Sequence, residues 1–325
     1  MKKRIEWRRT AGYLTTLLTI VLLGELFAVF VVERHRGLES PTKDIQVERQ
    51  IDFIDGFADG AGIVVAGTSM AGVGVDPVVL TRETGVVTFN ASLGCGNPLV
   101  MEDWLLNFVA PELDPGVVVL SVAPTDLDRD ACPREWTEIE MLVTPSNGRQ
   151  IDVRAYLREN SALWRNRDWL RGINNLPLLV FGNDWVWDVT FRPDGFWVVD
   201  DYAPVDKDVF LLNPNRTQIR AEAPYANALE RTIEELSTTG VHVVVAEVPM
   251  AQRWIDHLAG SNRSYTEAQD YLREIAEENG ASFIGTTQDL HDNEGFIDEG
   301  HMTPEAAAVY SKYLSDALTE IQATN

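Results

Sequence analysis

The sequence is poor in cysteine, histidine and basic side chains, and each shortage removes a class of function. Its 325 residues include two cysteines and five histidines, none in zinc-ligand spacing and with no His-Glu-x-x-His segment, so neither a metal nor another cofactor is expected. Lysine and arginine number 27 against 50 acidic residues, a formal charge of −23. Such a surface repels nucleic acid and disfavours docking on anionic lipid by charge alone. A saline habitat or genome bias explains the acidity, or else a cationic partner does.

The segment 63–74, IVVAGTSMAGVG, lacks the features of a nucleotide-binding loop. A P-loop needs Lys-Ser or Lys-Thr after its second glycine, but Gly72 is followed by valine and glycine, and the dinucleotide spacing is missing too. GTSMA does come close to the Gly-x-Ser-x-Gly elbow of α/β-hydrolases, with Ala71 in the last place. Ser69 is therefore a candidate nucleophile on a strand-to-helix turn, and ordinary turn chemistry is the alternative.

One long apolar run lies near the N-terminus. From Ala11 to Val32 the chain is apolar apart from a few hydroxyls and Glu25, and as a helix it spans about 33 Å, enough to cross a bilayer. Basic residues precede it, and no Ala-x-Ala-like site or lipobox cysteine follows. An uncleaved anchor is favoured over a cleaved signal peptide, with the N-terminus in the cytoplasm, the rest of the chain outside the cytoplasmic membrane, and Glu25 facing a partner helix. The basic residues are Lys2, Lys3, Arg4, Arg8 and Arg9.

Short β-branched runs alternate with helical patterns through most of the remaining chain. Continuous apolar runs suit parallel strands that are buried on both faces. The alternation predicts an α/β fold for residues 61–325, with a doubly wound (flavodoxin-like), five-stranded parallel sheet. Residues 1–36 would hold the cytoplasmic N-terminus and anchor, and residues 37–60 a polar tether that includes an amphipathic helix. The five runs are 63–66, 86–90, 117–122, 241–248 and 282–284, and the helical patterns are 98–109, 223–239, 264–279 and 304–321.

Residues 133–215 interrupt this rhythm. The stretch shows no clean strand–helix alternation, and it carries many of the tryptophans of the chain. It is interpreted as an insertion, either with a small core of its own or as a cap whose aromatic side chains bind sugar rings or acyl chains beside the active site. Its tryptophans are Trp136, Trp164, Trp169, Trp185, Trp187 and Trp197.

Asp298 and His301 supply what a serine nucleophile needs. A serine hydroxyl is a poor nucleophile until a neutral imidazole takes its proton, and that imidazole needs a carboxylate on its other nitrogen. The two residues stand three positions apart, just before a helical pattern capped by Thr303, so one rigid loop can present both. The alternative is that His301 only caps local structure and Asp298 is solvated. Among the other histidines, His291 is the nearest rival.

These blocks resemble the SGNH (GDSL-like) esterases and acyltransferases. The family's Gly-Asp-Ser block after the first strand resembles Gly67-Thr68-Ser69, with threonine in place of aspartate. Its closing Asp-x-x-His block is matched by Asp298 and His301. The resemblance implies that Ser69 attacks an acyl ester, that His301 acts as general base and then acid, and that Asp298 orients His301.

The same resemblance implies an oxyanion hole. The family's glycine after the second strand is matched in NASLGCGNP by Gly94, and its Gly-x-Asn-Asp block aligns with APTD. Thr125 stands where the family has an asparagine that donates to the oxyanion. The backbone N–H groups of Ser69 and Gly94 would hold the oxyanion, with help from Thr125. The resemblance covers residues 60–130 and 240–321 and leaves the tryptophan-rich insertion outside it.

Within the family, the single anchor and APTDL resemble membrane-tethered members that work beside polysaccharide or teichoic-acid modification systems with a membrane O-acyltransferase partner. The resemblance implies an extracytoplasmic serine esterase or O-acyltransferase acting on acyl esters of cell-envelope carbohydrate, with water or a sugar hydroxyl as acceptor. The alternative is a catalytically degenerate SGNH-fold binding or scaffold protein in an envelope polymer modification complex. An intact serine, aspartate and histidine favour the enzyme, although fold alone does not fix a substrate.

The two cysteines, Cys95 and Cys132, are expected to form a disulfide in the oxidising space outside the membrane. Cys95 follows the second expected strand and Cys132 the third, and loops after parallel strands leave the same edge of a sheet. A bridge there would pin the segment that carries Gly94. Two buried, reduced thiols are the alternative.

Overall fold

The computed structural model describes residues 16, 19–28, 43–57, 60–94, 96–128, 161, 187–202, 219, 221–258 and 262–324. The chain divides into two units: Met1–Thr42 with Pro145–Trp185, and Lys43–Thr144 with Val186–Asn325. In the first unit, residues 19–28 are helical. Among the described residues, no helix has the length and apolar character needed to span a membrane. About half of the expected anchor and most of the expected insertion lie outside the described residues, so both stay predictions.

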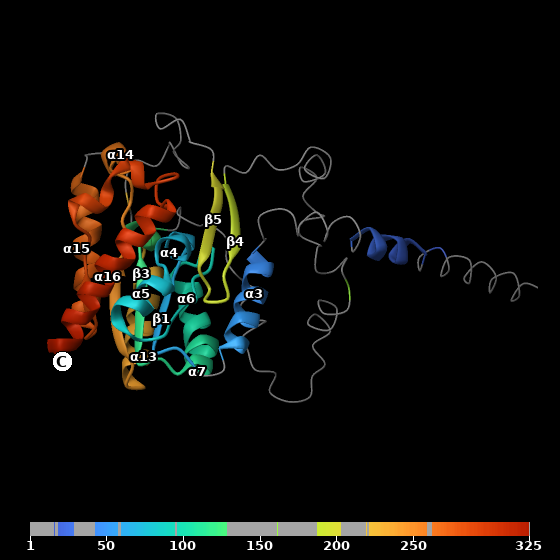
Figure 1. Cartoon of the computed structure of the whole chain (residues 1–325), viewed down its shortest axis with the longest axis horizontal. Helices are drawn as coiled ribbons and strands as arrows, with labels where there is room; N and C mark the ends of the chain where they lie inside the picture. The colour runs from blue at the N-terminus through green and yellow to red at the C-terminus, as the bar shows by residue number, and fades with distance from the viewer. Residues whose placement is uncertain are drawn as a thin grey trace, which may run out of the picture. The chain divides into compact units, whose positions relative to one another are not determined.

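The second unit is built on a five-stranded parallel sheet with the strand order β2-β1-β3-β6-β7 (Figure 1). This order is that of a doubly wound sheet whose direction of winding switches between its first and third strands. The expected α/β class and the five parallel strands are confirmed. Each strand overlaps one of the apolar runs: β1 (Ile63–Gly67), β2 (Thr88–Asn90), β3 (Val117–Val122), β6 (His242–Glu247) and β7 (Ser282–Ile284).

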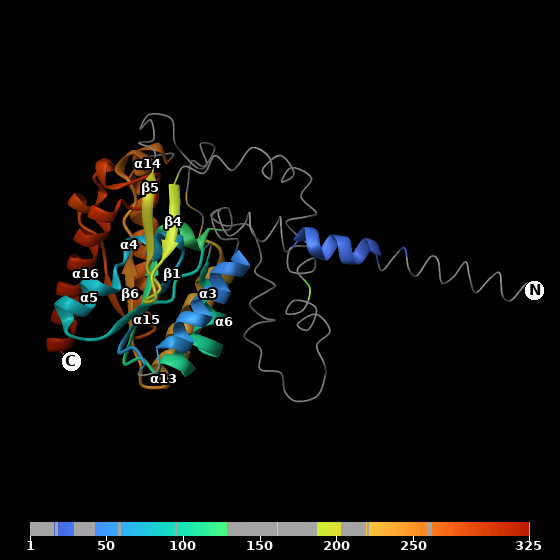
Figure 2. The same cartoon turned by 45° about the vertical axis from the view of Figure 1, so that its right-hand side comes forward.

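Helices cover both faces of this sheet, as Figure 2 shows from a second side. Successive side chains of a strand point to opposite faces, so Val64 and Val118 join one buried cluster while Val65 and Val119 join the other. The first cluster is covered by α3 (Lys43–Gly56), α6 (Pro98–Trp104), α7 (Ala110–Leu113), α13 (Ala223–Thr238) and α15 (Asn262–Glu278). The second is covered by α4 (Ser69–Gly74), α5 (Pro77–Thr84), α14 (Gln252–His257) and α16 (Pro304–Thr324).

Two of the helices begin at capping side chains that the sequence provides. The Asp76 carboxylate accepts the Val78 N–H at 2.9 Å at the start of α5. The Asn97 amide oxygen accepts the Val100 N–H at 3.2 Å at the start of α6. Both helices have proline in their first turn, where the missing N–H costs nothing. These caps fix where α5 begins after α4 and where α6 begins after the loop that follows β2.

Helix α3 covers the outer edge of β2 and its continuation. In a parallel pair, the backbone groups of alternate residues face the neighbouring strand, and those between them face outward. The outward carbonyls of Asn90 and Ser92 accept from Gln50 Nε2 at 3.2 Å each, and the outward N–H of Gly94 donates to Gln46 Oε1 at 3.0 Å. One turn of helix separates the two glutamines, so both reach the same edge.

The apolar side of α3 belongs to the core. Val47 and Ile54 are buried in the cluster on the first face of the sheet, and Ile51 packs against it. These are the residues whose spacing indicated an amphipathic helix within the expected tether. The stretch 37–60 therefore includes a helix that is an integral layer of the second unit.

Strand β1 ends in a close approach to β3. Gly67 is paired in register with Ser121, and a Cβ on Gly67 would lie 2.2 Å from the Ser121 carbonyl oxygen. Only glycine fits at that distance. The chain then turns directly into α4, which places Ser69 at the carboxyl end of the sheet.

Gly67→Ala is expected to lower the free energy of unfolding by about 2–3 kcal/mol, because the added methyl group has backbone rather than a movable side chain in its way. Gly116→Ala is the matched control, since its Cβ would lie an ordinary 3.7 Å from the Gly62 carbonyl oxygen. Urea unfolding followed by tryptophan fluorescence measures both variants. Equal losses would contradict the close approach at Gly67.

Candidate active site

Three side chains form one hydrogen-bonded chain at the carboxyl end of the sheet. Ser69 opens α4 directly after β1, and its Oγ lies 2.8 Å from His301 Nε2. His301 Nδ1 lies 2.6 Å from Asp298 Oδ2. The structure thus brings together the three residues selected from the sequence, although Ser69 and His301 are 232 positions apart.

The Asp298 carboxylate is 1% exposed, and both of its oxygens have partners. Oδ2 pairs with His301, and Oδ1 accepts the backbone N–H groups of Gly300 at 2.9 Å and His301 at 2.8 Å. Burial acts to raise the pKa of Asp298, but the charge of His301 and these hydrogen bonds outweigh it, and the pKa is lowered. An ionised Asp298 holds the proton on His301 Nδ1, which leaves Nε2 to accept the Ser69 hydroxyl proton.

His301 is tuned as a base by its acidic surroundings. Burial acts to lower the pKa of His301, but the charge of Asp298, the hydrogen bond to it, and the charges of Glu299 and Asp126 act against burial, and the pKa is raised. A raised pKa makes the imidazole a stronger base. It also means that His301 is protonated, and unable to accept a proton, up to a higher pH.

The loop that carries Asp298 and His301 closes on itself. The Ile297 N–H donates to the His301 carbonyl at 2.8 Å, and the Thr303 N–H donates to the Gly295 carbonyl at 2.9 Å. At the tip, a Cβ on Gly300 would lie 2.3 Å from Met70 Sδ, so the residue after the nucleophile packs against the glycine before the base.

The structure corrects the assignment of Gly94 to the oxyanion hole. Its N–H donates to Gln46 of α3, on the side of β2 that faces away from β1. The N–H of the preceding residue, Leu93, is the one that faces β1, where it donates to the Gly67 carbonyl at 3.0 Å. The sequence could not show which way this N–H points. The Ser69 N–H belongs to the first turn of α4, where a backbone N–H has no partner inside the helix.

Thr125 lies in the short turn Pro124–Leu127 that follows β3. It is 2% exposed, and its hydroxyl donates to Met250 Sδ at 3.9 Å, which is a weak acceptor. Met250 in turn packs at 3.4 Å from the place of a Cβ on Gly300. Thr125 is thereby placed beside the loop that presents His301.

His291, the rival histidine, belongs to another cluster. Its Nδ1 lies 2.7 Å from the Met250 carbonyl oxygen and its Nε2 lies 2.9 Å from Thr286 Oγ1, and the ring is buried. Cys95 and Cys132, and with them the expected disulfide, lie outside the described residues. In the part of the chain that the structure describes, no group of three His, Cys, Asp or Glu side chains is placed to hold a metal ion.

The expected insertion contributes a hairpin, β4 (Trp187–Phe191) with β5 (Trp197–Tyr202), that packs on the catalytic segments. Trp197 is 3% exposed and covers Gly72 of α4, where a Cβ would lie 2.7 Å from the indole ring. Val73 of α4 and Ile297, next to Asp298, belong to the same buried cluster as Trp197. The hairpin therefore packs directly on the helix of the nucleophile and shares a buried cluster with the loop of the acid–base pair.

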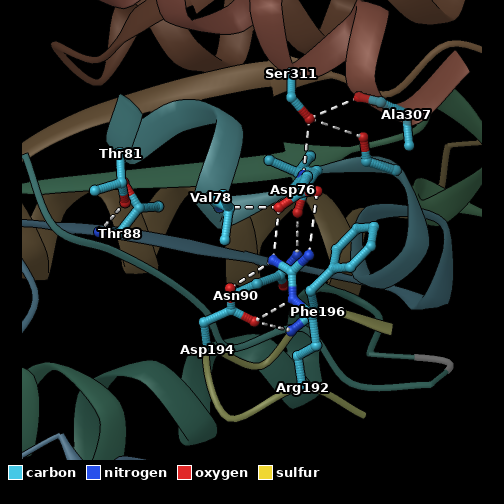
Figure 3. A network of polar contacts seen from close by, with 12 residues as sticks. Asp76, Val78, Thr81, Thr88, Asn90, Arg192, Asp194, Phe196, Ala307 and Ser311 are labelled. Atoms are coloured by element: carbon cyan, nitrogen blue, oxygen red, sulfur yellow. Dashed lines mark hydrogen bonds and ion pairs between the residues drawn. The ribbon is translucent and has the colours of Figure 1, made fainter. Parts of the chain in front are cut away.

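Arg192 fastens this hairpin to the rest of the unit (Figure 3). Its Nη2 lies 2.6 Å from Asp76 Oδ1 and 2.5 Å from Asp194 Oδ2, and the guanidinium lies over the ring of Phe196. The Asp194 carbonyl accepts the Asn90 N–H at 2.9 Å. Arg-Pro-Asp-Gly at 192–195, between two runs rich in aromatic and β-branched residues, is a hairpin signal that the sequence analysis did not use.

Gly72→Ala is expected to displace the Trp197 indole and lower the midpoint of thermal unfolding by roughly 3–8 °C. Gly74→Ala on the same helix is the control, since its Cβ would meet only the flexible end of Met302 at 3.2 Å. Differential scanning calorimetry compares the two. A loss in Gly74→Ala as large as in Gly72→Ala would show that Trp197 is not the tight contact.

No family model matches this chain, and no curated protein does. Solved structures similar to it include a GDSL-like lipase from Bacteroides thetaiotaomicron, 9% identical with a TM-score of 0.42, over 85% of this chain and 98% of that one. A candidate acylhydrolase from Bacteroides fragilis is 11% identical with a TM-score of 0.45, over 87% and 99%. A catalytic mutant of an acetylxylan esterase from Geobacillus stearothermophilus is 12% identical with a TM-score of 0.40, over 79% and 94%. At these identities and TM-scores, the activity of this chain has to be argued from its own site.

Proposed function

We propose that this chain is a serine esterase or O-acyltransferase that works outside the cytoplasmic membrane on acyl esters of cell-envelope carbohydrate. The observation that carries the proposal is the unbroken chain of hydrogen bonds from Ser69 through His301 to a buried Asp298. Nucleophile, base and orienting carboxylate stand in the order that acyl transfer requires. The anchor at residues 11–32 and the membrane O-acyltransferase partner belong to the proposal through the resemblance described above.

The geometry supports a two-step acyl transfer. As Ser69 Oγ attacks the acyl carbon, His301 Nε2 takes the hydroxyl proton, and Asp298 stabilises the imidazolium that forms. His301 then gives that proton to the departing alcohol oxygen, which leaves the acyl group on Ser69. Water or a sugar hydroxyl attacks the acyl-enzyme with His301 again as base, and Ser69 recovers its proton. In this scheme the Ser69 N–H, in the first turn of α4, is the backbone donor to the developing oxyanion, and Thr125 is the candidate for a second donor.

A degenerate binding or scaffold protein is the second candidate, and two observations favour it. The Gly94 N–H is engaged by Gln46, and threonine replaces the asparagine of the resembling family at position 125. An oxyanion hole short of donors costs about 10²–10³ in rate for each donor removed. The bonded triad weighs more heavily, because a binding protein has no need of an ionised aspartate buried behind a histidine.

Ser69→Ala is expected to abolish both hydrolysis of an aryl acetate and labelling by a fluorophosphonate probe, since loss of a triad nucleophile costs about a million-fold. Thr125→Ala is expected to lose far less, as an auxiliary donor. Ser315→Ala, a buried serine of α16 that bonds the Lys312 carbonyl, serves as the matched control. Turnover or labelling that survives in Ser69→Ala would favour the scaffold alternative.

The rate should fall on the acidic side with an apparent pKa above the ordinary histidine value of about 6.5, because the pKa of His301 is raised and only its neutral form accepts a proton. Asp298→Asn should lower kcat by about 10⁴, since the amide cannot hold the proton on Nδ1. Profiles of kcat/KM against pH for both proteins measure this. An acid limb centred below 6.5 in the wild type would contradict a raised pKa of His301.

A further inference from the structure

Arg253, the second residue of α14, makes hydrogen bonds to the loop that carries Asp298 and His301. Its Nη2 donates to the carbonyl oxygen of Asp298 at 2.7 Å, and its Nη1 donates to the carbonyl oxygen of Asn293 at 3.2 Å. Its backbone N–H donates to Asn293 Oδ1 at 2.8 Å. The forked guanidinium thus spans the start of the loop and the residue whose carboxylate orients His301.

The two residues before α14, Met250 and Ala251, also help to hold this loop. The Ala251 N–H donates to the Glu299 carbonyl at 3.0 Å, so bonds from one short segment reach both Asp298 and the residue after it. The Met250 carbonyl lies 2.7 Å from Nδ1 of the buried His291, which fixes that segment in turn. The segment from Met250 to Arg253, which links β6 to α14, therefore holds the loop of Asp298 and His301 in place.

Arg253 also brings a positive charge to an acidic site. The charged groups that face His301 are Asp298 and Glu299 of its own loop and Asp126 of the turn after β3, while α4 presents the neutral Ser69 hydroxyl. Burial lowers the pKa of Arg253, and the charge of Asp298 acts to raise it, so the two groups interact electrostatically. A guanidinium stays charged at any pH at which the protein is folded.

We propose that Arg253 is a positioning residue of the active site, which holds the Asp298 carbonyl so that the carboxylate stays aligned with His301 Nδ1. The proposal rests on the proposed function of Ser69 and His301. Without this hold, the pairing of Asp298 with His301 weakens, and because that pairing raises the pKa of His301, the imidazolium loses its proton at a lower pH. The residue touches no reacting atom, and it acts through Asp298.

The test compares Arg253→Met, which removes charge and fork, with Arg253→Lys, which keeps the charge. Arg231→Met is the matched control, because Arg231 of α13 makes an equally forked pair with Glu102 at 2.6 and 2.7 Å on the exposed surface. Two quantities are measured on the full chain: kcat and KM for an aryl acetate, and the titration of His301 by NMR on histidine-labelled protein. Calorimetry checks that each variant is folded.

Arg253→Met is expected to lower kcat about ten- to hundredfold with KM within about threefold, and to move the His301 titration downward by about half a pH unit or more, because the pairing with Asp298 is weakened. Arg253→Lys should leave the titration in place and lose less of kcat, and Arg231→Met should change neither quantity. A His301 titration that is unmoved or moves upward in Arg253→Met overturns the proposal, as does an unchanged kcat. If the wild type shows no Ser69-dependent turnover, the proposed esterase function is wrong, whereas the His301 titration still decides the role of Arg253. If Arg253→Met does not fold, the titration and kcat of Arg253→Lys decide it.

Discussion

The burial of the Asp298 carboxylate is the constraint on which the site depends. Asp298 is almost fully buried, and a buried charge is tolerated only when its oxygens are paired. Its partners, the Gly300 N–H and the His301 ring and N–H, come from its own loop, so the loop has to curl tightly around the carboxylate. Contacts from outside the loop add to these bonds: Arg253 of α14 donates to the Asp298 carbonyl, and Met70 packs against Gly300.

Asp76 links several of these supports. Its carboxylate caps α5 and receives Arg192 of the hairpin, and its N–H donates to Ser311 Oγ of α16 at 2.8 Å. Asn90 plays a similar part on the other side, with its amide donating to the carbonyls of Ala71 at 3.0 Å and Val75 at 2.8 Å in and after α4. The helix that presents Ser69 is thus held at its far end by β2 and covered by the hairpin β4–β5, and its position depends on both.

Sequence reasoning found the strands because strands buried on both faces leave unbroken apolar runs, as in 117–122. It found Ser69, Asp298 and His301 because their chemistry is local to two short segments. It missed α4, α5 and α14, which are too short to show a helical period, and it expected a single helix over 98–109 where α6 gives way to a π-helical turn. The direction of the Gly94 N–H was beyond its reach, because that direction depends on which residues of α3 cover the edge of β2.

The cover that α3 provides has a practical consequence for anyone who shortens this chain. Removing everything before Ile63 would strip Gln46 and Gln50 from the edge of β2 and leave its outward carbonyls and the Gly94 N–H bare. A bare strand edge is a template on which another chain can pair, and such edges lead to self-association and precipitation. A soluble version of the second unit therefore has to keep the chain from Lys43 onward, even though no residue of α3 carries the proposed chemistry.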